Sequence, residues 1–360
     1  MPGKPSPGGN DGVEYVDSFE TLLDFGPAMS PTHPRRDFLA AAAGTGLLGA
    51  AAPRLVADER ADVPAKAEPV SLKLSLNTST IRGQKLSVPE QIRVTADAGY
   101  DAIEPWIGDL RGYVDGGGKL ADLRRQLDGA GIGISGAIGF AKWIVSDDAE
   151  RAAGLNEARR DMEMIRSLGG VRMAAPPVGA HTAATLADSG PIELQVVAER
   201  YRALLEVGEE MGVTPMLELW GFSPTLSRLE ELAYVATATA HDRAALLPDF
   251  YHIYKGGNDM ASLGMIEASR MPLFHINDYP HDPPRETIAD NARVFPGDGV
   301  CPLVDTIAML LQNGFTGTFS LELFNPRYWK RPAEQVAREG YEKSRAVIDS
   351  ACHRVSEPVA

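Results

Sequence analysis

Residues 191–219 read PIELQVVAERYRALLEVGEEMGVTPMLEL, and this stretch holds one full repeat of the pattern that decides the fold. Apolar residues recur at helical spacing from Pro191 to Met211, Gly212 follows as a helix-stop signal, and a short apolar run extends over Thr214–Leu219. A helix, a turn and a short β-rich run make up an α/β unit, and repeated units of this kind build parallel sheets.

The same alternation begins near Val70 and continues through the rest of the chain. Eight short runs are predicted as strands: Leu72–Asn77, Ala102–Trp106, Gly133–Ile138, Val171–Ala175, Thr214–Leu219, Ala245–Asp249, Leu273–Asn277 and Thr318–Leu323. The stretches between them predict helices at Pro89–Ala98, Leu120–Ala130, Glu150–Ser167, Pro191–Met211, Leu226–Ala240, Val304–Asn313 and Ala333–Cys352, with the sixth helix of the repeat, the least periodic, near Asp259–Ser269.

Eight βα units in one chain predict the α/β class and closure into a single-domain (β/α)8 TIM barrel over residues 70–352, with residues 353–360 as a tail. An open, doubly wound sheet is the main alternative. No Gly-x-Gly-x-x-Gly motif follows the first predicted strand, so the sequence gives a dinucleotide site no support.

The composition narrows the classes of partner. The chain has 360 residues, 44% of them hydrophobic, and a formal net charge of −14. This acidic balance argues against nucleic acid as a partner, because phosphate backbones are bound by basic faces. Cys301 and Cys352 are far apart in the sequence and do not indicate a disulfide framework.

The N-terminal segment, residues 1–69, is interpreted as an extension that carries an export signal and a linker. Arg35 and Arg36 precede an apolar, small-residue run from Ala40 to Ala52, which resembles a twin-arginine signal; a chance arginine pair before an alanine-rich helix is the alternative. The run is shorter than an ordinary membrane span, so we expect a periplasmic or extracytoplasmic protein without a membrane partner after signal removal, with an uncleaved anchor as the alternative. Met29 is the expected start of translation.

Polar residues that could bind a metal ion interrupt the apolar ends of four successive predicted strands. These residues are Glu218, Asp249, His275 and Glu322, on the fifth to eighth strands. Carboxyl ends of barrel strands meet at one mouth, and buried carboxylates are costly unless they are paired or bound to metal. Three carboxylates and an imidazole suit Mn²⁺, Mg²⁺, Co²⁺ or Zn²⁺. A ring of salt bridges or solvated rim charges is the alternative.

The order of these motifs resembles that of the xylose isomerase-like TIM barrels, the sugar phosphate isomerase/epimerase superfamily. The motifs are Glu218, Asp249-x-x-His252, His275-x-x-Asp278 and Glu322, and the similarity spans residues 72–350. The superfamily includes ketose 3-epimerases, inosose dehydratases, hydroxypyruvate isomerases and AP endonucleases.

This resemblance implies roles for individual residues. Glu218, Asp249, His275 and Glu322 would bind the metal ion, and Glu218 and Glu322 would also form an acid/base pair on opposite sides of the substrate. His252 would contact the substrate. The loop of residues 293–299, RVFPGDG, looks like the one that follows the seventh strand in these proteins, and Arg293 is assigned to substrate binding.

Three further residues at strand ends are assigned to the substrate pocket. Glu104 could orient His252 or a substrate hydroxyl, while Trp106 and Trp220 offer aromatic faces to a sugar. A structural hydrogen bond for the glutamate and ordinary packing for the tryptophans are the alternatives. Pro248 comes directly before Asp249 at the end of the sixth strand. Because proline cannot donate a hydrogen bond to a β-ladder, the sequence does not fix the backbone register of Asp249.

The predicted function is a metal-dependent sugar isomerase or epimerase that acts on a ketose or related polyol through an enediolate. Three alternatives stay open: a lyase or dehydratase on inosose-type or 3-keto-glycoside substrates, AP-endonuclease-like hydrolysis, and an exported sugar-binding barrel without catalysis. The predicted partner is a small-molecule sugar, and a homo-oligomer is compatible with the sequence.

Overall fold

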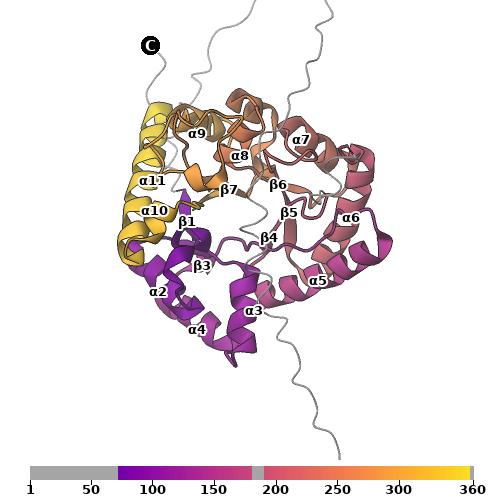
Figure 1. The fold of residues 1–360 in the computed structure, drawn as a ribbon, viewed down its shortest axis with the longest axis horizontal. Helices are drawn as coiled ribbons and strands as arrows, with labels where there is room; N and C mark the ends of the chain where they lie inside the picture. The colour runs from indigo at the N-terminus through magenta and orange to yellow at the C-terminus, as the bar shows by residue number, and fades with distance from the viewer. Residues whose placement is uncertain (1–71, 181–189, 357–360) are drawn as a thin grey trace, which may run out of the picture.

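A computed structural model describes residues 72–180 and 190–356 of the protein, and the predicted signal, linker and start site lie outside them. Eight strands form the centre: β1 (Lys73–Asn77), β2 (Ala102–Glu104), β3 (Gly133–Ile134), β4 (Arg172–Ala175), β5 (Thr214–Glu218), β6 (Ala245–Leu247), β7 (Leu273–Ile276) and β8 (Thr318–Leu321). Helices surround the strands as a ring (Figure 1).

The long outer helices are α2 (Val88–Ala98), α3 (Ile107–Asp115), α4 (Leu120–Ala130), α5 (Asp148–Ser167), α6 (Leu194–Met211), α7 (Leu229–Ala238), α9 (Leu303–Gln312) and α11 (Ala333–Ser356). Shorter ones are η1 (Thr78–Gln84), α8 (Phe250–Lys255), η2 (Met260–Met265), η3 (Ala268–Arg270), η4 (Asp290–Ala292) and α10 (Pro326–Trp329). None of the described helices is long and apolar enough to cross a membrane.

The strands close into a parallel barrel. Regular pairing gives two sheets, in the orders β3-β2-β1-β8-β7 and β4-β5-β6. Single hydrogen bonds join them at both gaps: the Ala174 N–H donates to the Ala137 carbonyl at 2.8 Å, and the His275 N–H donates to the Pro248 carbonyl at 2.9 Å. The (β/α)8 barrel prediction is therefore confirmed, and the open sheet is excluded.

Strand alternation separates the inside of the barrel from its helical coat. Met216 and Leu273 belong to a small cluster of buried side chains, while their neighbours Leu217 and Phe274 belong to the large cluster packed under the helices. Because successive side chains point to opposite faces, Glu218 and His275, two residues further on, point back to the interior. The strand period thus aims the polar residues at the barrel mouth.

The helix-stop signal quoted above is confirmed. Gly212 ends α6 with a φ of 68°, and its N–H donates to the Glu209 carbonyl. A residue with a side chain is strained at this φ, whereas glycine adopts it readily. Helix α6 begins at Leu194, three residues after the predicted start.

The sixth repeat departs from the prediction. We expected a helix near Asp259–Ser269, but α8 begins directly after β6 and only short 3-10 turns occupy the expected range. The Asp249 side chain accepts a hydrogen bond from the His252 N–H at 2.9 Å and so caps a helix at the strand end. The predicted strand therefore ends at Leu247, two residues early.

Other differences concern element ends and short helices. Helices α3 and α10 were not predicted, and α11 continues to Ser356 instead of ending at Cys352. The second and third strands were predicted to end at Trp106 and Ile138, but β2 ends at Glu104 and β3 at Ile134. Trp106 and Ile138 still form an isolated parallel bridge.

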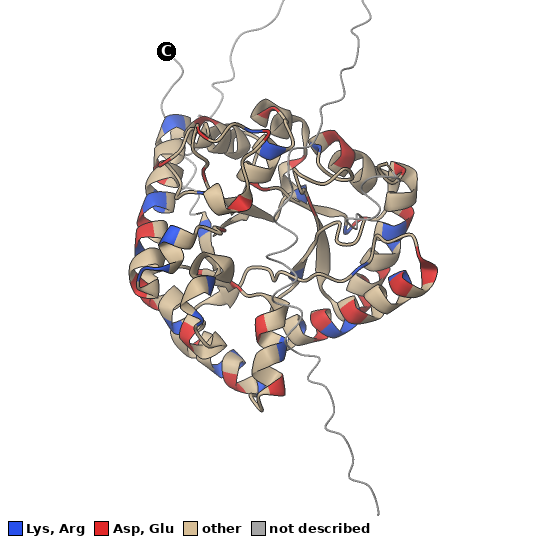
Figure 2. Cartoon of the chain, viewed as in Figure 1, with Lys and Arg blue, Asp and Glu red and all other residues tan. Residues whose placement is uncertain are grey.

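Charged residues of both signs are mixed along the outer helices in the view of Figure 2. No run of one sign is apparent on that side.

Candidate metal centre and active site

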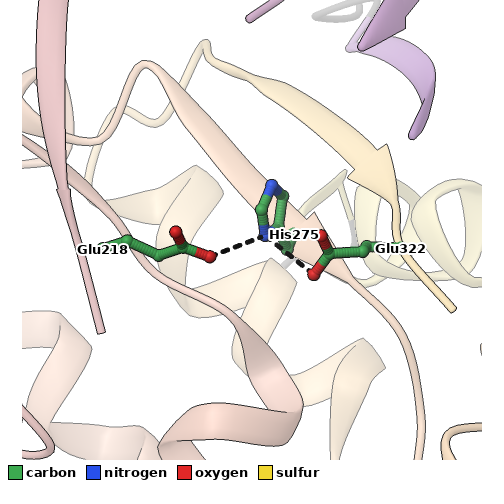
Figure 3. Close-up of side chains that lie close together, drawn as sticks. All are labelled: Glu218, His275 and Glu322. Carbon is green, nitrogen blue, oxygen red and sulfur yellow. Dashed lines mark ion pairs between the residues drawn. The ribbon is translucent and has the colours of Figure 1, made fainter. Parts of the chain in front are cut away.

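Three of the four predicted metal ligands converge inside the barrel mouth. Glu218, His275 and Glu322 each offer an atom within 4.8 Å of the others, and all three side chains are buried. The His275 Nδ1 atom lies 3.8 Å from Glu218 Oε1 and 3.2 Å from Glu322 Oε2. Figure 3 shows the two carboxylates approaching the imidazole from opposite sides.

The fourth predicted ligand, Asp249, lies next to this group but has other partners. Its Oδ2 atom is 3.6 Å from His275 Nδ1 and accepts hydrogen bonds from Asn277 Nδ2 at 3.0 Å and Arg293 Nη1 at 2.9 Å. An isolated parallel bridge pairs Asp249 with His275 across the gap between β6 and β7. Pro248 therefore does not disturb the register of Asp249, because the Pro248 carbonyl accepts a hydrogen bond from the His275 N–H.

Glu104 is fully buried and is not among the described residues that line the cleft. Its Oε2 atom accepts hydrogen bonds from Asn77 Nδ2 at 3.0 Å and Ser320 Oγ at 2.7 Å, and it lies 3.2 Å from His275 Nε2. These contacts agree with the alternative of a structural hydrogen bond, and the assignment of Glu104 to the substrate pocket stays a prediction. A carboxylate behind an imidazole holds the proton on Nε2 and turns Nδ1 toward the site.

Arg293 lies at the floor of the cleft and links several acidic groups. Its Nη1 atom donates to Asp249 and to Glu322 Oε2, each at 2.9 Å, while Nη2 contacts Asp290 and lies 3.0 Å from His252 Nε2. The side chain is buried, yet it lines the cleft. Arg293 therefore orders the site in addition to facing a ligand.

His252 also lines the cleft and is buried against the ring of Phe222. Burial lowers the pKa of His252, and the nearby charge of Arg293 lowers it further, against the opposing charges of Asp249 and Asp290. The imidazole is therefore neutral at physiological pH. Both ring nitrogens have neighbours: the Gly221 N–H donates to Nδ1 at 3.3 Å, and Nε2 lies 3.0 Å from Arg293 Nη2.

The two central glutamates have different surroundings. Glu322 accepts hydrogen bonds from Asn77 Nδ2 at 3.1 Å and from Arg293, whereas no described residue donates a hydrogen bond to the Glu218 side chain. Burial raises the pKa of Glu218 well above its usual range; the charge of His275 opposes this, and the charges of Glu322 and Asp249 add to it. The two glutamates therefore differ in their hydrogen-bond partners among the described residues.

A divalent cation fits this donor set. The buried Nδ1 atom of His275 has no hydrogen-bond partner within the described residues, although it points at three carboxylates. The predicted alternative, a ring of salt bridges, is present in part, because Arg293 pairs with Asp249 and Glu322. One arginine does not account for the free imidazole nitrogen or for Glu218, which an ion bound between them would satisfy.

Aromatic side chains form the walls of the cleft above the ligands. The cleft is lined by Trp106, Phe140, Trp220, Phe222 and Phe324, among others. Trp106 and Trp220 thus lie where the sequence analysis placed them. Aromatic faces of this kind pack against the C–H faces of sugar rings.

Asn77 is a site residue that the sequence analysis overlooked. Its amide donates to both Glu104 and Glu322, and its carbonyl oxygen accepts from the Trp106 indole at 2.9 Å and from the Ser79 N–H at 3.0 Å. The signal was present, since Asn77 is the polar last residue of the first predicted strand. The rule that singled out Glu218 on the fifth strand applies equally to the first.

The family model described as "Xylose isomerase-like TIM barrel" matches residues 92–347, more than two thirds of the chain. The chain belongs to this family. Among curated proteins, an "Inosose isomerase" of Bacillus velezensis is 28% identical over 278 residues, which is 77% of this chain and 97% of that protein. A "3-dehydroshikimate dehydratase" of Pseudomonas putida is 22% identical over 277 residues, 75% of this chain and 40% of that protein.

The fold is also that of solved structures. A 1.8 Å crystal structure of the IOLI protein with a bound zinc atom matches with a TM-score of 0.70 and 22% identity, over 78% of this chain and 99% of that one. The prediction of an isomerase-type enzyme agrees with the name of the Bacillus relative. Neither comparison assigns an ion or a substrate to this chain.

Proposed function

We propose that this protein is a metal-dependent isomerase or epimerase that moves a proton at a carbon next to a keto group in a sugar or cyclic polyol. The observation that carries the proposal is the placement of Glu218 and Glu322 on opposite sides of His275 Nδ1, at 3.8 and 3.2 Å. Two carboxylates that face each other across a substrate carbon can remove a proton from one side and return one to the other.

Glu218, Asp249, His275 and Glu322 would hold the ion, which supplies Lewis-acid polarisation of a substrate carbonyl. Glu218 serves as the general base that removes the proton from the neighbouring carbon. Glu322 returns a proton from the opposite side. His252 contacts the substrate from the wall of the cleft, and Arg293 keeps the carboxylates in position.

The lining of the cleft supports a sugar or cyclic polyol as the substrate. Its walls are largely aromatic, and aromatic faces pack against the C–H faces of such rings. The names of the relatives agree with this class. The zinc atom bound by the IOLI protein makes Zn²⁺ the first ion to test, beside Mn²⁺, Mg²⁺ and Co²⁺.

A dehydratase is the second candidate, because one relative carries that name. The same residues would serve: Glu218 removes the proton next to the keto group, and the hydroxyl on the following carbon leaves as water after protonation by Glu322. The products differ, since dehydration forms a conjugated enone that absorbs ultraviolet light and isomerisation does not.

The test is proton exchange in deuterated water. Metal-loaded protein incubated with inososes and ketohexoses should incorporate deuterium beside the keto group, detected by NMR. Glu218→Gln should abolish the exchange, whereas Glu163→Gln, on an exposed face of α5, should leave it unchanged. Absence of exchange with every substrate, together with no enone, would refute both candidate functions.

We also propose export by the twin-arginine route, which rests on Arg35 and Arg36 before the apolar run that ends at Ala52. Fractionation of cells that express the full chain tests it: the protein should leave the cytoplasm, and replacing both arginines by lysine should retain it. An unchanged distribution would refute the signal.

A further inference from the structure

A positively charged side chain outside the metal centre packs on a residue of the cleft wall. Arg82 belongs to η1, the turn that follows β1, and its guanidinium carbon lies 3.4 Å from the centroid of the Trp106 ring. Trp106 lines the cleft together with Glu218 and Glu322. The arginine is therefore one side chain away from the cleft, and it interacts electrostatically with Glu322 in the cleft wall.

The Arg82 guanidinium has no carboxylate partner in the described part of the chain. Asp109 and Glu322 act on it electrostatically without forming an ion pair, and Glu322 is already bonded to Asn77 and Arg293. Burial lowers the pKa of Arg82 against these two charges, which means that its charged group has lost much of its water. A partly desolvated cation without a counter-ion is unfavourable unless a ligand supplies one.

The turn that carries Arg82 is held rigidly. The Trp329 indole donates to the Ser79 carbonyl at 3.0 Å, and the Gln84 amide donates to two backbone carbonyls beside α10 at 3.1 and 2.9 Å. Gly83 lies directly against Trp329, where a Cβ atom would come within 2.1 Å of the Trp329 Cβ. A fixed turn loses little entropy when a ligand binds, so the arginine is pre-organised.

We propose that Arg82 binds a carboxylate of the substrate, which makes this enzyme one for keto sugars that carry an acid group, such as ketouronates. The inference rests on the proposed function and adds the substrate class. A guanidinium stacked on an indole keeps its edge free, and the planar edge of arginine matches a carboxylate in two parallel hydrogen bonds. The cation also offsets the repulsion between an acidic substrate and the carboxylates of the metal centre.

Matched substrate pairs test the proposal. Deuterium exchange by the metal-loaded protein is measured with D-fructose against D-fructuronate and with D-tagatose against D-tagaturonate, which differ only in a terminal acid group. The uronates should have the higher kcat/KM. Arg82→Met should lower kcat/KM for the uronates about 10- to 100-fold, mainly through KM, because hydrogen bonds between charged groups of this kind are the stronger ones.

The controls separate substrate binding from a structural role. Arg82→Met should change the neutral ketoses less than threefold, Arg82→Lys should restore part of the uronate activity, and Arg93→Met, at an exposed position on α2, should change neither. Equal losses for both members of a pair would mean that Arg82 only supports Trp106, and would overturn the proposal. A preference for the neutral ketose, or for D-fructose 6-phosphate over the uronate, would overturn it as well.

Failure of the proposed function would be seen separately, as a lack of exchange with every substrate. In that event calorimetry decides about Arg82 without turnover: D-glucuronate should bind the metal-loaded protein more tightly than D-glucose, and Arg82→Met should remove the difference. Equal affinities in the unaltered protein would refute the carboxylate site.

Discussion

Replacement of Glu104 by glutamine should weaken metal binding while leaving substrate binding nearly intact. The Glu104 Oε2 atom lies 3.2 Å from His275 Nε2 and accepts hydrogen bonds from Asn77 and Ser320. Glutamine preserves the shape and can still accept the imidazole proton, but it removes the negative charge that makes the other ring nitrogen a stronger ligand.

The expected loss of metal affinity can be taken from other metal sites in which a hydrogen-bond partner of a ligand was removed. Loss of such a partner lowers metal affinity about 10- to 100-fold, which corresponds to roughly 1.4 to 2.7 kcal/mol. Glu104→Leu should be worse, because three buried donors would each lose their acceptor at a cost of about 1 to 3 kcal/mol apiece as an upper bound. That variant should also be destabilised in urea.

Metal titration distinguishes this reasoning from the assignment of Glu104 to the substrate. Calorimetry with Zn²⁺ and visible absorption of the Co²⁺-loaded protein give the affinity and the ligand geometry, and KM is measured at saturating metal. Glu163→Gln serves as the exposed control. A metal Kd within twofold of the unaltered protein, combined with a KM at least tenfold higher, would show that Glu104 contacts substrate and that the argument is wrong.

Three further predictions concern the ion, a buried carboxylate and a glycine. An ion at a hundred times its Kd should stabilise the fold by about 2.7 kcal/mol and raise Tm by roughly 5 to 10 °C, and His275→Ala should abolish this response to EDTA and metal in calorimetric scans. Burial raises the pKa of Asp161 to about 6 in spite of its ion pair with Arg111, so its contribution to stability is present below pH 4 and lost as the pH rises through 6. Urea unfolding at several pH values should give the free energy of unfolding of the unaltered protein and of Asp161→Asn. Between about pH 4 and pH 6 the unaltered protein should lose about 3 kcal/mol relative to the variant, and a constant difference would contradict the raised pKa. A Cβ at Gly221 would meet the His252 carbonyl oxygen at 2.3 Å, so Gly221→Ala should cost about 1 to 3 kcal/mol and lower activity, whereas Gly108→Ala, with open space around it, should do neither.

The barrel and three of its converging ligands were predictable because both depend on local patterns. A strand's side chains alternate, and parallel strands in a barrel all end at one mouth, so polar residues such as Glu218 and Glu322 at strand ends must meet. The sixth repeat was not predictable in this way. There the Asp249 side chain caps a helix immediately after the strand, which replaces the periodic helix that we expected further along.

The sequence by itself determined the fold class, the barrel mouth as the site, and the pairing of carboxylates with an imidazole, because these follow from periodicity and residue type. Only the tertiary structure decided which polar side chains form hydrogen bonds with the metal-binding residues. Glu104 supports His275 from a strand 171 residues away, and Asn77 bonds to Glu322 across 245 residues. Arg82 has no carboxylate partner within residues 72–180 and 190–356 for the same reason: whether a charge finds a partner depends on contacts between distant segments, which no local pattern encodes.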